Sequence, residues 1–182
     1  MKKSKMTIVV SGGAKGSDYL WSSLAIDNGL KVEIMSFKGH YISTPIGSSV
    51  KVLSVKDLDE MYEQLVNVSK TLKRDIPKTI YTRNLLLRNI HIVKDVDAVF
   101  AISYLYDSIV SGGTAWGCHY HLSYHQKPQL FLFDMKTNNW LTNVKGEWIS
   151  ATPPNVMEFS KVALIGSREL TTEAKIAMKN IF

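Results

Sequence analysis

Two short apolar runs in this chain end in the same tripeptide, Ser-Gly-Gly, and a stretch with helical character follows each of them. The first copy lies in residues 8–18 and the second in residues 109–117. Glycines between a strand and a helix let the backbone approach a ligand closely, and the free N–H groups at the helix start attract an anion. An ordinary tight turn would explain one copy. Two copies favour a pocket built from both turns that holds a phosphate-bearing small molecule.

The apolar segments predict strands that alternate with helices. Strands are expected at residues 6–10, 31–36, 98–103, 129–133 and 162–165, and helices at residues 17–28, 58–72, 80–94, 114–125 and 171–182. Turn-forming residues predict irregular structure at residues 37–53, 104–113 and 138–154. This order is typical of an α/β fold, a three-layer sandwich with a mostly parallel sheet. Ligands of such folds bind beyond the carboxyl ends of the strands, where both glycine turns lie.

Composition narrows the function. A chain of 182 residues suffices for one domain with a substantial core. It has no apolar run long enough to span a membrane, so a cytoplasmic location without membrane partners is expected. The net charge of +6 suits either nucleic acid or an anionic metabolite. Without an RNA-recognition signature, zinc-finger spacing or a dense Lys/Arg block, the metabolite is favoured and nucleic acid is the lesser alternative.

Three histidines on the helix predicted at residues 114–125 invite a metal-site interpretation. Only His121 and His125, four residues apart, share a face well, and the single cysteine, Cys118, is the one further ligand type nearby. Surface or partly buried histidines explain the pattern better. Neither a metal nor a cofactor is expected.

One group of candidate ligand-binding residues lies in and next to the first glycine turn. The candidate ligand-binding residues there are Ser11, Gly12, Gly13, Lys15, Gly16, Ser17 and Asp18. The glycines either bring the turn close to a phosphate or ribose or simply form a close strand–helix turn. Ser17 can cap the following helix. Asp18 is explained equally by the helix dipole and by contact with a ribose hydroxyl.

A second group of candidates comes from the second turn and from the helix predicted at residues 80–94. Its members are Arg83, Arg88, Asn89, Ser111, Gly112, Gly113, Thr114 and Trp116. Arg88 can hold a phosphate through two parallel hydrogen bonds, although a solvated basic face is the alternative. Trp116 can stack on a purine base or pack against a neighbouring helix. Tyr104 and Tyr106 can form a lid over the ligand.

Three strings stand in an order that resembles the SLOG superfamily of Rossmann-like nucleotide-binding proteins. They are Gly12–Asp18, Arg88-Asn89 followed by Asp97-Ala98-Val99, and Gly112-Gly113-Thr114. The resemblance covers residues 6–134. It implies one domain over residues 1–182, with a Rossmann-like core at about 6–134 and a C-terminal extension, 135–182, packed on it. Residues 162–168 also resemble the opening strand and turn of such a domain, which either completes the sheet or is left from a second module.

One departure from the superfamily bears on activity. Its LOG-type phosphoribohydrolases carry a catalytic glutamate soon after the glycine motif, whereas this chain has no acid between Asp107 and Asp134. Cleavage of an N-glycosidic bond ordinarily needs a nearby carboxylate. The expected function is therefore to bind a nucleotide or nucleotide-derived signal as a sensor or sequestering protein, as a homo-oligomer like many relatives, and without catalysis. The alternatives are a nucleoside 5′-monophosphate N-glycosidase that uses Asp18 and a DprA-like nucleic-acid binder.

Overall fold

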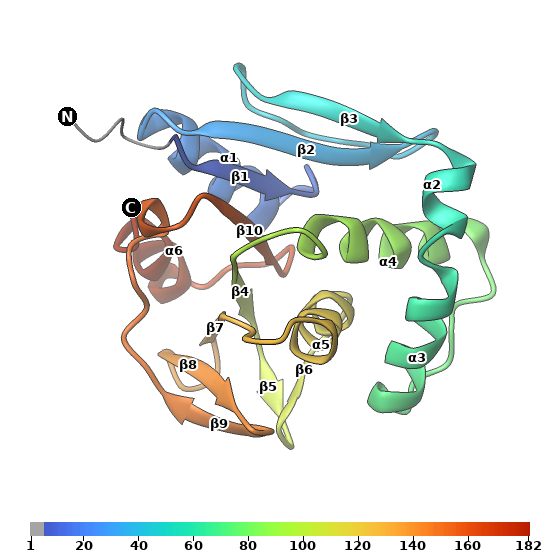
Figure 1. Cartoon of the computed structure of the whole chain (residues 1–182). Coiled ribbons are helices and arrows are strands. Elements are labelled where there is room, and N and C mark those ends of the chain that lie inside the picture. Colours follow the sequence, from blue (N-terminus) through green and yellow to red (C-terminus); the bar gives the residue numbers. More distant parts are fainter. Residues whose placement is uncertain (1–5) are drawn as a thin grey trace.

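An eight-stranded sheet organises the molecule in the computed structural model, which describes residues 6–182 (Figure 1). Its parallel strands are, in order across the sheet, β3 (Ser49–Leu53), β2 (Lys31–Phe37), β1 (Ile8–Ser11), β10 (Lys161–Gly166), β4 (Ala98–Ser103) and β7 (Leu130–Asp134). The antiparallel hairpin of β8 (Asn139–Val144) and β9 (Glu147–Ser150) extends the sheet beyond β7. The predicted fold class, a Rossmann-like α/β sandwich with a mostly parallel sheet, is confirmed.

Helices cover both faces of the sheet. One face carries α1 (Ser17–Asp27) and α6 (Thr172–Lys179), and the other carries α2 (Val55–Asp59), α3 (Tyr62–Leu72), α4 (Ile80–Val93) and α5 (Thr114–Tyr124). Successive side chains along each strand point to opposite faces of the sheet and pack in two separate cores. In β10, for example, Val162 and Leu164 pack with α1 and α6, whereas Ala163 and Ile165 pack on the other side.

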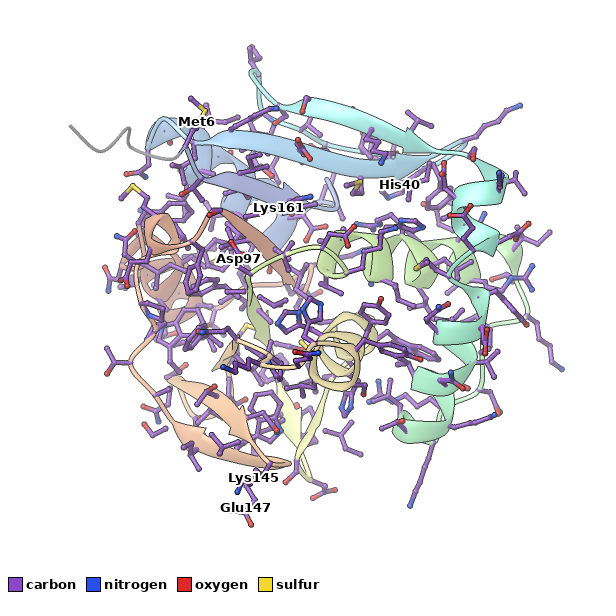
Figure 2. The ribbon with its side chains drawn as sticks, viewed as in Figure 1. Met6, His40, Asp97, Lys145, Glu147 and Lys161 are labelled. Atoms are coloured by element: carbon purple, nitrogen blue, oxygen red, sulfur yellow. The ribbon has the colours of Figure 1, made fainter. Side chains whose placement is uncertain are left out.

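The strand β10 lies in the middle of the sheet, between β1 and β4 (Figure 1). The Asp97 carboxylate fixes its start, because it accepts hydrogen bonds from the backbone N–H groups of Ser160 and Lys161, both at 2.9 Å; Asp97 and Lys161 are labelled in Figure 2. Residues 162–168 therefore complete this sheet. The segment expected to be a C-terminal extension, 135–182, thus supplies a central strand of the sheet.

Sequence patterns missed several peripheral elements. The edge strand β3, of whose five residues four are exposed, lies in the segment 37–53, where Gly, Pro and Ser residues predicted irregular structure. The β8–β9 hairpin and the short pair β5 (Leu105–Tyr106) and β6 (Ile109–Val110) were likewise expected to be irregular. The single helix expected at residues 58–72 is two helices in the structure, since α2 ends at Asp59 with Glu60 as its C-cap and α3 begins at Tyr62.

A short 3-10 turn, η1 (Val156–Glu158), leads into β10. In the described part of the chain, no helix is both long and apolar enough to cross a membrane.

Candidate functional site

A cavity of about 690 Å³ opens at the carboxyl ends of the central strands. It lies where the chain order across the sheet reverses, since β2 and β3 extend from β1 to one side and β4 and β7 lie on the other. Open α/β sheets bind ligands at this place. The turn after β1, the loop after β2, helix α4, the turn before α5 and the turn after β10 all contribute. The lining residues are Ala14, Lys15, Asp18, His40, Tyr41, Tyr81, Thr82, Leu85, Leu86, Arg88, Asn89, Ile92, Gly112, Gly113, Thr114, Ile165, Gly166, Ser167 and Arg168.

A buried ion pair forms one wall of the cavity. The Arg88 Nη1 atom lies 3.6 Å from Asp18 Oδ2, and the two side chains are 5% and 10% exposed. Asp18 Oδ2 also accepts a hydrogen bond from the Ala14 N–H group at 3.3 Å. Burial outweighs the mutual attraction, so it raises the pKa of Asp18 and lowers the pKa of Arg88. Arg88 Nε has no hydrogen-bond partner within residues 6–182.

The glycines of the first turn do not line the cavity. Gly12 and Gly16 instead leave room for the ion pair and for neighbouring backbone. A Cβ atom on Gly12 would collide with the Arg88 guanidinium and lie 2.6 Å from Asp18 Oδ2. Gly16, at φ 92°, packs against the backbone carbonyl of Arg168, where a side chain has no room. Gly16 therefore lets the turn pack against the Arg168 backbone, and Gly12 makes room for Arg88.

The turn after β10 is joined directly to the first turn. The Ser17 N–H and hydroxyl groups both donate to the Ser167 carbonyl, at 3.1 and 2.6 Å. A side chain on Gly166 would meet Ser17 Oγ at 2.6 Å. These contacts hold Arg168 at the cavity. The sequence signal for Arg168 is the Gly-Ser-Arg string at the end of residues 162–168, which resembles a strand followed by a turn.

The second glycine turn is fixed from two helices. Past the end of α3, Arg74 donates to the carbonyls of Val110 and Gly112, both at 3.2 Å, and Asn89 of α4 donates to the Gly113 carbonyl at 3.1 Å. No side chain caps the α5 N-terminus, where Gly113 is the N-cap residue. The start of α5 at the cavity is thus backbone-lined and carries the partial positive charge of a helix N-terminus.

Several predicted site residues do not line the cavity. They are Ser11, Gly12, Gly13, Gly16, Ser17, Arg83, Ser111 and Trp116. Trp116 is only 4% exposed and packs in the hydrophobic core, so its side chain is not placed to stack on a ligand in the cavity. Ser11 donates its hydroxyl hydrogen bond to the Leu164 carbonyl at 2.7 Å.

The proposed lid and the histidines also lie elsewhere. Tyr104 and Tyr106 stack on each other, with ring centroids 6.0 Å apart, and neither lines the cavity. The rings of His121 and His125 are 4.0 Å apart. Within residues 6–182 no group of three or more His, Cys, Asp or Glu side chains is placed to hold a metal ion.

The loop after β2 contributes a residue that sequence patterns did not single out. His40 lies near the carboxyl end of β2, beside α4 (Figure 2). Its Nδ1 atom is 3.2 Å from Ser36 Oγ, and its ring stacks on Phe37 with centroids 4.9 Å apart. Burial, together with the charges of Arg88 and Arg168, lowers the pKa of His40 to about 4. The imidazole is therefore neutral near pH 7.

Comparison with known proteins identifies the fold alone. No family model matches the sequence, and no curated protein matches it. Among solved structures, the chain is similar to the crystal structure of a "Putative molybdenum carrier protein" from Syntrophus aciditrophicus SB, with a TM-score of 0.57 and 17% sequence identity. The likeness covers 97% of this chain and 92% of that one. It supports the Rossmann-like α/β fold over almost the whole chain.

Proposed function

We propose that this chain, as a member of the SLOG superfamily, binds a phosphate-bearing, nucleotide-like small molecule in the cavity and releases it unchanged. Such a protein acts as a sensor or by sequestering its ligand. One observation carries the proposal. Arg88 is buried at the cavity wall with an unpartnered Nε, and the uncapped N-terminus of α5 lines the same cavity. Buried polar groups without partners are rare, and a ligand anion supplies the missing acceptor.

The charges of the cavity favour an anion. Lys15, Arg88 and Arg168 line it together with a single carboxylate, Asp18. Asp18 pairs with Arg88, while Lys15 and Arg168 make no ion pair within the described chain. His40 is neutral near pH 7 and adds no charge. Cationic side chains in a hollow of low dielectric raise the local concentration of anionic ligands.

The size of the cavity favours an organic ligand over a bare oxyanion. A volume of about 690 Å³ lies within the range of roughly 300–1,000 Å³ typical of small-molecule sites. A tetrahedral oxyanion would occupy one corner of it. The neighbour named as a molybdenum carrier nevertheless makes molybdate a necessary probe, because the same cationic groups recognise both kinds of anion.

Hydrolysis of the ligand is the second candidate, and one observation favours it. Asp18 is a buried carboxyl group with a raised pKa at the edge of the cavity, which is a common arrangement for a general acid. Its pairing with Arg88 and its hydrogen bond to Ala14 tie it to the protein instead. No other carboxylate lines the cavity, so the second carboxylate that glycosidic hydrolysis ordinarily uses to activate water is lacking there.

A ligand panel tests both candidates. The protein is incubated separately with nucleoside mono- and diphosphates, cyclic nucleotides, ribose 5-phosphate, inorganic phosphate and molybdate, freed of unbound ligand and denatured, and the released species are weighed by mass spectrometry. Intact nucleotide near one equivalent supports binding. Free base and ribose phosphate at many equivalents per protein would favour the glycosidase, and Asp18→Asn would then be the first variant to test. No bound species from the whole panel would refute the proposal.

A further inference from the structure

We infer that the base of the ligand binds against an aromatic wall formed by His40, Tyr41 and Tyr81, with its phosphate held at Arg88 and Arg168. This inference rests on the proposed function and narrows it to ligands in which a planar heteroaromatic ring is joined to an anionic group. All three aromatic side chains line the cavity.

One buried ring, that of Phe37, packs against two members of the aromatic wall, His40 and Tyr81. Phe37, only 4% exposed, stacks on His40 with centroids 4.9 Å apart and meets Tyr81 edge-on at 5.7 Å. Phe37 ends β2 and Tyr81 lies in the first turn of α4, so the cluster joins the sheet to the helix. Aromatic side chains held in this way present their rings with little loss of conformational freedom on binding.

The outer rings of this wall are open to a ligand. Tyr41 is 73% exposed and Tyr81 is 45% exposed, although both line the cavity. The Lys15 ammonium lies 6.0 Å from the Tyr41 ring centroid. A stacked base would remove this aromatic surface from water, and stacking is the interaction that aromatic side chains offer to bases of any sequence.

Helix α4 sets the distance between the two ends of the ligand. Tyr81, Leu85, Arg88 and Ile92 recur at helical spacing and all line the cavity. Tyr81 and Arg88 are seven residues apart, which corresponds to about 10 Å along a helix. This is the rise of the backbone along the helix axis, and a nucleoside monophosphate lying along α4 would place its base at Tyr81, its sugar across Leu85 and its phosphate at Arg88.

His40 offers a polar atom that could form a hydrogen bond with the edge of the base. His40 Nδ1 is paired with Ser36, and Nε2 makes no hydrogen bond within the described residues. A neutral imidazole carries one N–H donor and one acceptor nitrogen, so His40 can bond to a base edge without adding charge. Trp116, buried in the core, leaves the stacking role to the tyrosines.

Calorimetry with matched probes tests the base site. AMP, GMP, CMP, UMP and ribose 5-phosphate are titrated into the wild-type protein and the Tyr81→Ala, Tyr81→Phe and Tyr41→Ala variants. We expect at least one nucleotide to bind about tenfold or more tightly than ribose 5-phosphate, since stacking of one base has this magnitude. Tyr81→Ala and Tyr41→Ala should remove most of that advantage and leave ribose 5-phosphate unaffected, whereas Tyr81→Phe should retain it.

The control is Tyr62→Ala, which removes another half-exposed tyrosine, on α3 and outside the cavity. Thermal unfolding checks that each variant is folded. Equal affinities for ribose 5-phosphate and every nucleotide, or nucleotide binding unchanged in the alanine variants, would overturn the base site and leave the anion site standing. If no probe binds the wild-type protein, the base site fails, and the proposed function fails with it when the wider ligand panel also yields no bound species.

Discussion

At the scale of single residues, the site depends on one side chain that is held in place by what surrounds it. Arg88 is buried, paired with Asp18 at 3.6 Å, and given room by the missing side chain of Gly12. Desolvating a guanidinium is costly unless its hydrogen bonds are satisfied, and Nε is unsatisfied within residues 6–182. An anion bound in the cavity would relieve that cost, as the proposed function expects.

Arg88→Ala should weaken binding of a nucleoside monophosphate by about 1.5–3 kcal/mol, the range for a hydrogen bond to a charged group. The uncharged nucleoside should lose much less. Calorimetry with both ligands measures the difference. Arg83→Ala is the matched control, because Arg83 lies on the same helix but outside the cavity. Equal losses for nucleotide and nucleoside would mean that Arg88 does not contact the phosphate.

Two glycine variants separate the pair from the cavity surface. Gly12→Ala should displace the Arg88 guanidinium, so both thermal stability and anion affinity should fall. Gly113→Val should leave the fold nearly intact, because the nearest atoms to a Cβ there are 3.6 and 3.8 Å away, yet weaken binding by filling the cavity edge. Melting temperature and calorimetry on both variants test this contrast. A stable Gly12→Ala protein with normal affinity would contradict the role given to Gly12.

The neutral state of His40 has a consequence for stability against pH. Its pKa is about 4 when folded and about 6.5 when unfolded. Between these values the unfolded chain binds more protons, so the free energy of unfolding rises with pH and falls as acid is added. His40→Gln should make that dependence shallower between pH 4 and 6.5. Urea unfolding at several pH values measures it, and an unchanged slope would mean that folding does not depress the pKa of His40.

At the scale of elements, the sequence predicted the strands that pass through the core and missed those at the edges. A strand such as β4, in which every residue is buried, can be recognised in the sequence as a continuous apolar run. The exposed edge strand β3 carries no such signal. For the site, patterns located the turns that bear Lys15 and Gly113. They could not locate His40 or Tyr81, because their place depends on how the loop after β2 meets α4.

One carboxylate before β4 holds the start of β10. Asp97→Ala removes two hydrogen bonds of 2.9 Å, from the backbone of Ser160 and Lys161. We expect a loss of about 1.5–3 kcal/mol in the free energy of unfolding, since the acceptor is charged and the donors lose their partner. Asp95→Ala, two residues earlier and also exposed, is the control. Equal unfolding free energies for the two variants, measured in urea, would mean that the Asp97 hydrogen bonds do not stabilise the start of β10.

At the scale of the whole molecule, the order of strands in space differs from their order in the chain. The last strand in sequence, β10, completes the middle of the sheet, and its turn supplies Ser167 and Arg168 to the cavity. Local patterns in the sequence cannot show this, because a strand inserted between two others is specified by contacts across more than 150 residues, as between Ser11 and Leu164. The fold and the site are therefore completed by the same late segment.

A chain that ends at residue 154 should consequently fail to fold. Without β10, the facing edges of β1 and β4 have no partner, and the cores on both faces lose Val162, Ala163, Leu164 and Ile165. Circular dichroism and urea titration should show no cooperative transition for residues 1–154 alone. Adding a peptide of residues 155–182 should restore cooperative unfolding and, with it, anion binding through Arg168. Cooperative unfolding of the shortened chain by itself would show that the central strand is dispensable, as expected of a peripheral extension.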